Sequence, residues 1–147
     1  MERVSWVRKL MLAVIAATLA AAVLGTTLSA STAGGRNRKN IAESRAHNFR
    51  VVVTAVKGSG GGDAPPATVG IKAFQRSPDG WHRLGSLRVG RRNGFFWKVV
   101  RKPGSIRDFT VTNGDARRAS LRLRISPSIG WSKVFRFRVD NGELVRA

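Results

Sequence analysis

Two short runs near the C-terminus alternate arginine with apolar residues, and this makes them the first candidates for a binding surface. In SLRLRI, Arg122 and Arg124 stand at every second position, and apolar residues fill the positions between them. FRFRV repeats the pattern with Arg136 and Arg138. Because strand side chains alternate between two faces, a hairpin of these runs would bury both apolar sets and place all four arginines outside. Planar guanidinium groups match phosphate and carboxylate oxygens. The spacing therefore predicts a polyanion-binding face.

The overall charge is large for a chain of 147 residues. Lysine and arginine number 27 against 8 aspartates and glutamates, a formal net charge of +19, whereas solubility alone asks for a net charge of about 2 to 8. Cell-wall polymer, acidic polysaccharide, nucleic acid and anionic lipid headgroups all suit such a surface. Two further origins of the charge stay open: a solvated face that prevents aggregation, and a GC-rich genome, whose codons favour the 20 arginines over the 7 lysines. Lys98, Arg101 and Lys102 are candidate extensions of the face.

Aromatic residues near expected turns form a second candidate site. Trp81 follows the turn at Gly80, and Trp131 lies in the connection SPSIGW, where rings can stack on a ligand or anchor a protein interface. Capping the end of an apolar core is the other role open to them. The run FFWKVV is apolar on both faces, which is typical of a central strand or of a strand that meets a partner. These features favour an alternative function, a secreted protein–protein interaction or inhibitor domain.

Residue types that perform catalysis are sparse. The chain has no cysteine, and its two histidines, His47 and His82, are too few for a metal site. Asp79 is close to His82 across a turn, but no serine stands beside them in a nucleophile-elbow pattern. Most carboxylates fall in turns or in the segment before residue 49, where local hydrogen bonding explains them. We therefore expect a non-enzymatic protein with no catalytic residue, no metal and no cofactor.

Residues 1–33 have the composition of a signal peptide. A basic head precedes nineteen uncharged residues, Leu10–Leu28, and small residues lead to Ala33, after which we expect cleavage. The uncharged run is longer than usual for such a signal, so a single-pass membrane anchor with the C-terminal domain outside stays open. Cleavage would leave 114 residues with 24 basic and 7 acidic side chains. Most of the positive charge therefore belongs to the exported part.

The remainder divides into a tether and a domain. Residues 34–48 hold almost no apolar residue and predict a flexible basic tether. Residues 49–147 contain short β-rich runs separated by Gly, Pro, Asn and Asp, which predicts an all-β domain. We expect a single antiparallel β-sandwich of seven to eight strands with an immunoglobulin-like layout. The runs are Phe49–Val56, Thr68–Arg76, Trp81–Val89, Phe95–Arg101, Ser105–Asn113, Ser120–Ser126, Ser132–Val139 and Glu143–Arg146. The turn sequences SPDG and DNG predict hairpins.

The signal-like segment, the rich use of arginine and alanine, and the strand-only body resemble small exported proteins of high-GC Gram-positive bacteria. The resemblance rests on architecture and composition, and it assigns no site residue. It implies a secreted or cell-envelope location. The partners that we expect are an anionic envelope polymer or a membrane surface, with another exported protein as the alternative and nucleic acid as a further polyanion.

Overall fold

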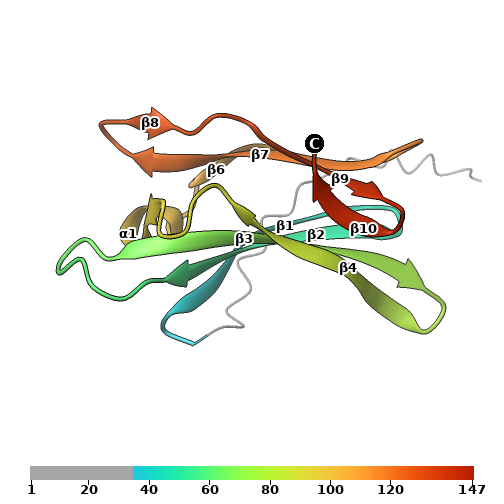
Figure 1. Ribbon diagram of the computed structural model, residues 1–147, viewed down its shortest axis with the longest axis horizontal. Helices are drawn as coiled ribbons and strands as arrows, with labels where there is room; N and C mark the ends of the chain where they lie inside the picture. Colours follow the sequence, from blue (N-terminus) through green and yellow to red (C-terminus); the bar gives the residue numbers. More distant parts are fainter. Residues whose placement is uncertain (1–34) are drawn as a thin grey trace, which may run out of the picture.

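The structure, a computed structural model, describes residues 35–147, and this part of the chain is almost entirely β-structure (Figure 1). It contains ten strands and one short helix, and the strands form two five-stranded antiparallel sheets. The elements are β1 (Arg38–Ala46), β2 (Phe49–Lys57), β3 (Pro66–Ser77), β4 (Gly80–Val89), β5 (Phe95–Phe96), α1 (Trp97–Val100), β6 (Ile106–Asn113), β7 (Arg117–Ser126), β8 (Gly130–Trp131), β9 (Phe135–Asp140) and β10 (Glu143–Arg146). Within residues 35–147, no helix is long and apolar enough to cross a membrane. The expected signal peptide, residues 1–33, lies outside the described residues.

Each sheet is formed by one continuous stretch of the chain. The first, sheet A, has the order β1-β2-β3-β4, with β5 paired to the start of β3. The second, sheet B, has the order β10-β9-β7-β6, with β8 paired to the end of β7. In an immunoglobulin-like layout, consecutive strands cross between the two sheets. The predicted layout is therefore wrong, because sheet A is complete before the chain enters sheet B, and the described residues form ten strands rather than seven or eight.

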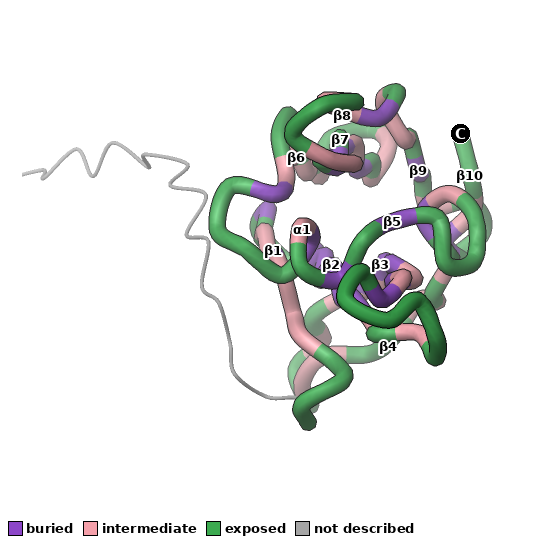
Figure 2. The backbone as a smooth tube through the Cα atoms, turned by 90° about the vertical axis from the view of Figure 1, so that its left-hand side faces the viewer, coloured by how far each residue is buried: buried purple, intermediate pink, exposed green. Residues whose placement is uncertain are grey.

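The inner faces of the two sheets share one apolar core. Its largest fully buried side chains are Phe49, Val51, Val53, Val69, Ile71 and Val89 of sheet A, Val100 of α1, and Leu121 and Leu123 of β7. At the two sides of the core, β1 contacts β6 and β10 contacts β4. Figure 2 shows the buried residues concentrated in the interior, around α1, β2, β3 and β7, with exposed loops around them. The alternating apolar residues of SLRLRI and FRFRV therefore enter the core, as predicted.

Both hairpins that the turn residues predict are confirmed. SPDG joins β3 to β4 through the two-residue turn Pro78-Asp79. DNG joins β9 to β10, and its central residues Asn141 and Gly142 have φ angles of 49° and 78°. Two successive positive φ angles are the requirement of a type I′ turn, whose twist matches that of the flanking strands. Asparagine and glycine adopt such angles at the lowest cost, so the local sequence determines this turn.

The prediction of a flexible tether over residues 34–48 is wrong for most of that segment, because Arg38–Ala46 form strand β1 at the edge of sheet A. Ala42 and Ala46 are buried in the strand, and Ile41 packs against the core. An edge strand needs to bury only one face, and small alanines do this with little hydrophobic signal in the sequence. The folded domain therefore begins with β1 rather than at Phe49.

The predicted strand Phe95–Arg101 is also wrong in part. Only Phe95 and Phe96 pair with β3, and Trp97–Val100 form a single helical turn. Trp97 and Val100 are both buried. Residues three apart lie on the same side of a helix, so the helical turn directs both side chains into the core. The helical turn therefore buries Trp97 and Val100 without a partner, whereas Phe96 of the same run stays exposed.

The new boundary of the domain can be tested with one substitution in β1. We expect Ala42→Asp to lower the free energy of unfolding by more than about 2 kcal/mol, because it places a carboxylate in the apolar core. Ala64→Asp is the matched control, since Ala64 is exposed between β2 and β3, and it should change stability by less than about 0.5 kcal/mol. Chemical denaturation measures both values. Equal stability of the two variants would mean that residues 38–46 add no strand to the core.

Candidate functional site

The outer face of sheet B carries the four predicted arginines. Arg122 and Arg124 of β7, with Arg136 and Arg138 of β9, are all exposed. The residues between them on each strand point toward the core, and β7 and β9 are antiparallel neighbours. The structure thus brings the four side chains to one face, because every second side chain of a strand points to the same side of the sheet.

The register of sheet B adds two arginines to this face. Arg118 lies directly opposite Arg138, and Arg107 of β6 lies opposite Arg122. Arg118 could have been found from the sequence, because in RRASLRLR it lies four residues before Arg122, and residues an even number apart along a strand point to the same face. Arg107 could not, because the pairing of β6 with β7 contains a register shift after Arg107. The arginine face, as we name it, comprises Arg107, Arg118, Arg122, Arg124, Arg136 and Arg138.

Two carboxylates partly neutralise the arginine face. Arg122 Nε lies 3.2 Å from Asp108 Oδ2, and Arg138 Nη2 lies 3.3 Å from Asp140 Oδ2. The four side chains are between 44% and 64% exposed. Ion pairs with such exposure contribute little to stability, and solvent and salt screen them. A competing anion can therefore replace either aspartate at low cost.

A hollow of about 600 Å³ lies within the arginine face, and hydroxyl side chains contribute to its lining. The hydroxyls belong to Thr110, Thr112 and Ser120, and the surrounding guanidinium groups to Arg118, Arg136 and Arg138. These residues form two cross-strand rows, in which Arg118 is opposite Arg138 and Ser120 is opposite Arg136. Among the described residues, Arg118 and Arg136 have no carboxylate within ion-pair distance. The hollow therefore offers Arg118 and Arg136, two cations without an ion-pair partner in the described part of the chain, together with hydroxyl donors.

Trp131, the first predicted aromatic contact, lies at one end of the arginine face. It pairs with Arg124 through β8. The guanidinium carbons of Arg107 and Arg124 lie 4.4 and 5.9 Å from the centroid of its ring. A guanidinium group within about 6 Å of an indole centroid is attracted by the negative face of the ring. The half-buried indole therefore orders two members of the arginine face.

Trp81, the second predicted aromatic contact, lies on the outer face of sheet A. The guanidinium carbons of Arg45 and Arg50 are 5.7 and 5.9 Å from its ring centroid. Trp81 and Trp131 thus belong to different sheets, and the structure does not bring them into one site. Each ring instead contacts two arginines of its own sheet. The sequence pattern could not predict these contacts, because they join residues of different strands.

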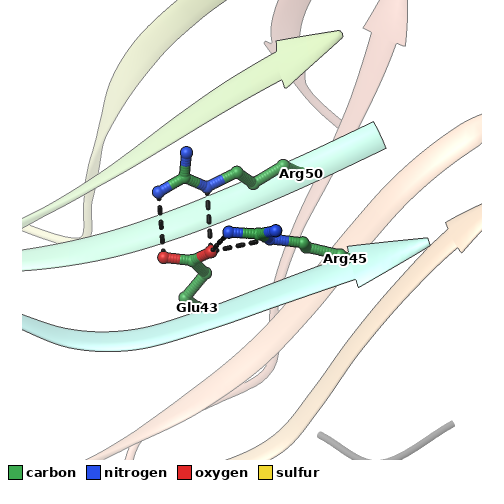
Figure 3. A network of polar contacts seen from close by, with 3 residues as sticks. All are labelled: Glu43, Arg45 and Arg50. Atoms are coloured by element: carbon green, nitrogen blue, oxygen red, sulfur yellow. Dashed lines mark hydrogen bonds and ion pairs between the residues drawn. The ribbon is translucent and has the colours of Figure 1, made fainter. Parts of the chain in front are cut away.

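Glu43 holds the two arginines beside Trp81 in place (Figure 3). Arg50 Nη2 donates a 2.9 Å hydrogen bond to Glu43 Oε2, and Arg45 Nε donates one of 2.9 Å to Glu43 Oε1. Burial alone would raise the pKa of the Glu43 carboxyl, but the hydrogen bonds and charges of Arg50 and Arg45 outweigh burial and lower the pKa below its ordinary value of 4.5. The buried Arg50 Nε makes no hydrogen bond, and Glu43 Oε1 at 2.9 Å is its ion-pair partner. Removal of the carboxylate would leave the buried Nε of Arg50 without a partner.

The three candidate extensions do not enlarge the arginine face. Arg101 and Lys102 follow α1 and line a separate hollow of about 400 Å³, beside Arg38 at the start of β1. Lys39 Nζ donates a 2.8 Å hydrogen bond to the backbone oxygen of Arg101 in the same region. Lys98 is exposed on α1. These cations form a basic group of their own at the junction of β1 and α1.

The turn between β3 and β4 brings Asp79 and His82 together without the geometry of an activated nucleophile. His82 Nε2 lies 3.5 Å from Asp79 Oδ2, and Ser77 Oγ donates a 2.7 Å hydrogen bond to Asp79 Oδ1. This bond is the largest of the effects that lower the pKa of the Asp79 carboxyl. The hydroxyl donates to the carboxylate rather than to the imidazole, so these three side chains are not arranged as a Ser–His–Asp triad, in which the imidazole takes the proton of the hydroxyl. Within residues 35–147, no group of three or more histidine or acidic side chains could hold a metal ion.

Comparison with known proteins yields no relative. No protein-family model, no curated protein and no solved structure matches the chain.

The cluster around Glu43 predicts a stability that depends on pH. We expect Glu43→Gln to lower the free energy of unfolding by about 1.5 to 3 kcal/mol near neutral pH, because hydrogen bonds to charged partners are lost. A carboxyl whose pKa is lowered by folding stabilises the protein above its ordinary pKa of 4.5, and this contribution disappears as the pH falls through the lower, folded value. The difference between parent and variant should therefore shrink below pH 4.5.

Urea denaturation of parent and variant over that pH range measures this difference. Glu143→Gln is the matched control, because Glu143 is exposed on β10 and should have little effect at any pH. A difference for Glu43→Gln that stays constant down to about pH 3 would mean that the carboxylate does not stabilise the fold through its charge.

Proposed function

We propose that this chain is an exported, non-enzymatic β-sandwich domain that associates with anionic envelope or extracellular polymers through the arginine face. One observation carries the proposal: six arginines from three neighbouring strands share one face, and three of them, Arg118, Arg136 and Arg138, line a hollow together with hydroxyls. A polymer with repeated phosphate or carboxylate groups can contact several of these cations at once, and it releases bound counterions as it does so. The flat guanidinium forks suit these groups better than ammonium groups would.

The cost of the arrangement to the fold also supports a binding role. Arg118 and Arg138 lie directly opposite each other, and like charges in a cross-strand pair destabilise a sheet by some tenths of a kcal/mol. Solvation does not require charge at these positions, since Thr110 and Ser120 fill equivalent positions on the same face as neutral polar residues. The arginines supply an attraction to anions that neutral polar residues in the same positions would not supply, and this supports a binding role.

A protein partner is the alternative, with the domain acting as an interaction or inhibitor module through Trp131 and Trp81. A stable protein interface usually has a buried apolar centre. Both tryptophan rings are half-buried and contacted by arginines. The large apolar side chains that are exposed among the described residues are Phe96 and Ile129, one on β5 and one between β7 and β8. Charge is the more extensive feature of the surface, so we favour the polyanion.

The proposed site is tested by the salt dependence of binding. We expect the exported protein to bind phosphocellulose and to elute as salt rises, because phosphate contacts release counterions. Replacing Arg122, Arg124, Arg136 and Arg138 by serine should reduce the slope of log affinity against log salt by about 3, since about 0.7 to 0.9 of a counterion is released per contact. Binding to a protein partner would instead resist salt and weaken with Trp131→Ala.

A second quadruple variant separates the arginine face from net charge. It replaces four exposed cations outside the face by serine: Arg36, Lys57, Arg91 and Arg92. Both variants lose the same formal charge, so the control should keep most of the slope of the parent. The arginine face is not the binding site if the face variant elutes at the same salt concentration as the parent, or if the two variants lose the same amount of slope.

The location of the protein is tested by the mass of the exported species. We expect a chain that begins at Gly34, which is the product of cleavage after Ala33. Mass spectrometry of the culture medium and of the envelope fraction measures this. A species with the mass of residues 1–147 in the membrane fraction would overturn the released form and establish the anchored one.

A further inference from the structure

A further, smaller hollow lies on the outer face of sheet A, on the opposite side of the molecule from the arginine face. Its volume is about 260 Å³, and residues of β2, β3 and β4 line it together with Arg38 of β1. Gly70, near the middle of β3, lies at its centre, with Thr54 opposite on β2 and Arg88 opposite on β4. The hollow exists because the central strand has no side chain at this position.

Neither backbone conformation nor packing requires a glycine at position 70. Its φ angle is not in the left-handed region, and a Cβ atom there would meet only the backbone oxygen of Leu87, at an ordinary 3.6 Å. A glycine inside a strand weakens the sheet, because it loses more backbone entropy and packs no side chain. The effect of Gly70 on the structure is therefore to keep the hollow open at some cost in stability.

The cations around the hollow have no acidic neighbour in it. Arg38, Lys72 and Arg88 reach it from three different strands, and among the described residues none of those that line it is a carboxylate. Burial, and then the charges of Arg38 and Arg83, lower the pKa of the Lys72 ammonium. A positive group that is partly desolvated among other positive groups is stabilised when an anion binds.

Hydroxyl groups supply further hydrogen-bonding capacity at the rim of the hollow. Ser86 Oγ accepts a 2.6 Å hydrogen bond from Arg83 Nη2, so its own O–H stays available as a donor. Thr54 Oγ1 donates instead to Asn40 Oδ1, at 2.9 Å. Glu43 on β1 and Lys72 on β3 lie in the same cross-strand row, on either side of Val52. The carboxylate of Glu43 already accepts hydrogen bonds from Arg45 and Arg50. The hollow is therefore lined by donors from Arg38, Lys72, Ser86 and Arg88, and no carboxylate of the described residues lines it to accept from them.

We propose that the hollow over Gly70 is a second anion site, which binds one phosphate or sulfate group through Arg38, Lys72, Arg88 and the hydroxyl of Ser86. A tetrahedral oxyanion presents oxygens in several directions, which suits donors that come from three strands. The site shares no residue with the arginine face, so it stands whether or not that face binds a polymer.

The test is a titration of the isotopically labelled full chain with inorganic phosphate, followed by nuclear magnetic resonance, with sodium chloride of equal ionic strength as the reference. We expect saturable shifts at Gly70, Lys72 and Arg88, and a rise in the pKa of the Lys72 ammonium. Gly70→Val should fill the hollow and weaken phosphate binding at least about tenfold, while the melting temperature stays the same or rises because valine favours strands.

Matched controls separate the hollow from general effects of substitution. Gly114→Val introduces the same side chain at a glycine with open space around it, and it should bind phosphate as the parent does. Lys72→Gln should lose binding, whereas Lys57→Gln, at an exposed lysine, should not. The two lysine variants keep the test valid even if Gly70→Val proves unstable. The serine variant of the arginine face should retain the phosphate shifts.

Three results would overturn the second anion site: shifts that sodium chloride reproduces, shifts that spread over all arginines without saturation, or unchanged binding by Gly70→Val and Lys72→Gln. The source of the anion is distinguished by three further titrations of the parent. Preference for glycerol phosphate over dimethyl phosphate indicates a terminal phosphate, equal binding of both indicates a polymer of phosphodiesters, and preference for methyl sulfate indicates a sulfated chain.

Discussion

Burial of one apolar face of each sheet against the other is the constraint on which the rest of the structure depends. Because Leu121, Leu123 and Phe137 point into the core, the residues between them must point into water. A slip of one residue along β7 would carry arginines into the core and leucines into solvent. The same register therefore fixes both the stability of the fold and the composition of the arginine face. Substitutions that disturb the core would displace the candidate site as well.

The parts of the fold that could be predicted are those in which local chemistry and burial agree. The segment SLRLRI of β7 and the strand β9 alternate strictly, and Asn141-Gly142 fits the turn that it forms. β1 escaped prediction because its inward residues include small alanines such as Ala42, which add little apolar signal to the polar residues around them. The helical turn at Trp97 escaped because four residues are too few to show a helical period. The order of strands depends on contacts between distant segments, which no local pattern contains.

The candidate site shows the same division. The alternation of side chains along a strand predicted four arginines of the arginine face and could have predicted Arg118. Arg107 belongs to the face only because β6 pairs with β7. The contacts of Trp131 and Trp81 with arginines join residues that are far apart in the sequence, so their spacing gives no signal. The hollow over Gly70 is least visible of all, since a glycine in a strand indicates only a weak strand. A sequence shows which residue types alternate along a strand. Which residues are neighbours on adjacent strands can be seen only in the structure.

The separation of sheet A and sheet B along the chain has a consequence for how the domain can assemble. A chain is synthesised from its N-terminus, and sheet A joins neighbouring segments, so its hairpins can close early. Val51 and Ile71 of its inner face belong to the same core as Leu121 of β7, so a sheet A that formed first would expose them to water until β7 had been made. During that interval, repulsion between the cations on the outer face would keep half-made domains apart. The positive charge would thus protect the nascent chain from aggregation before the folded protein meets any ligand.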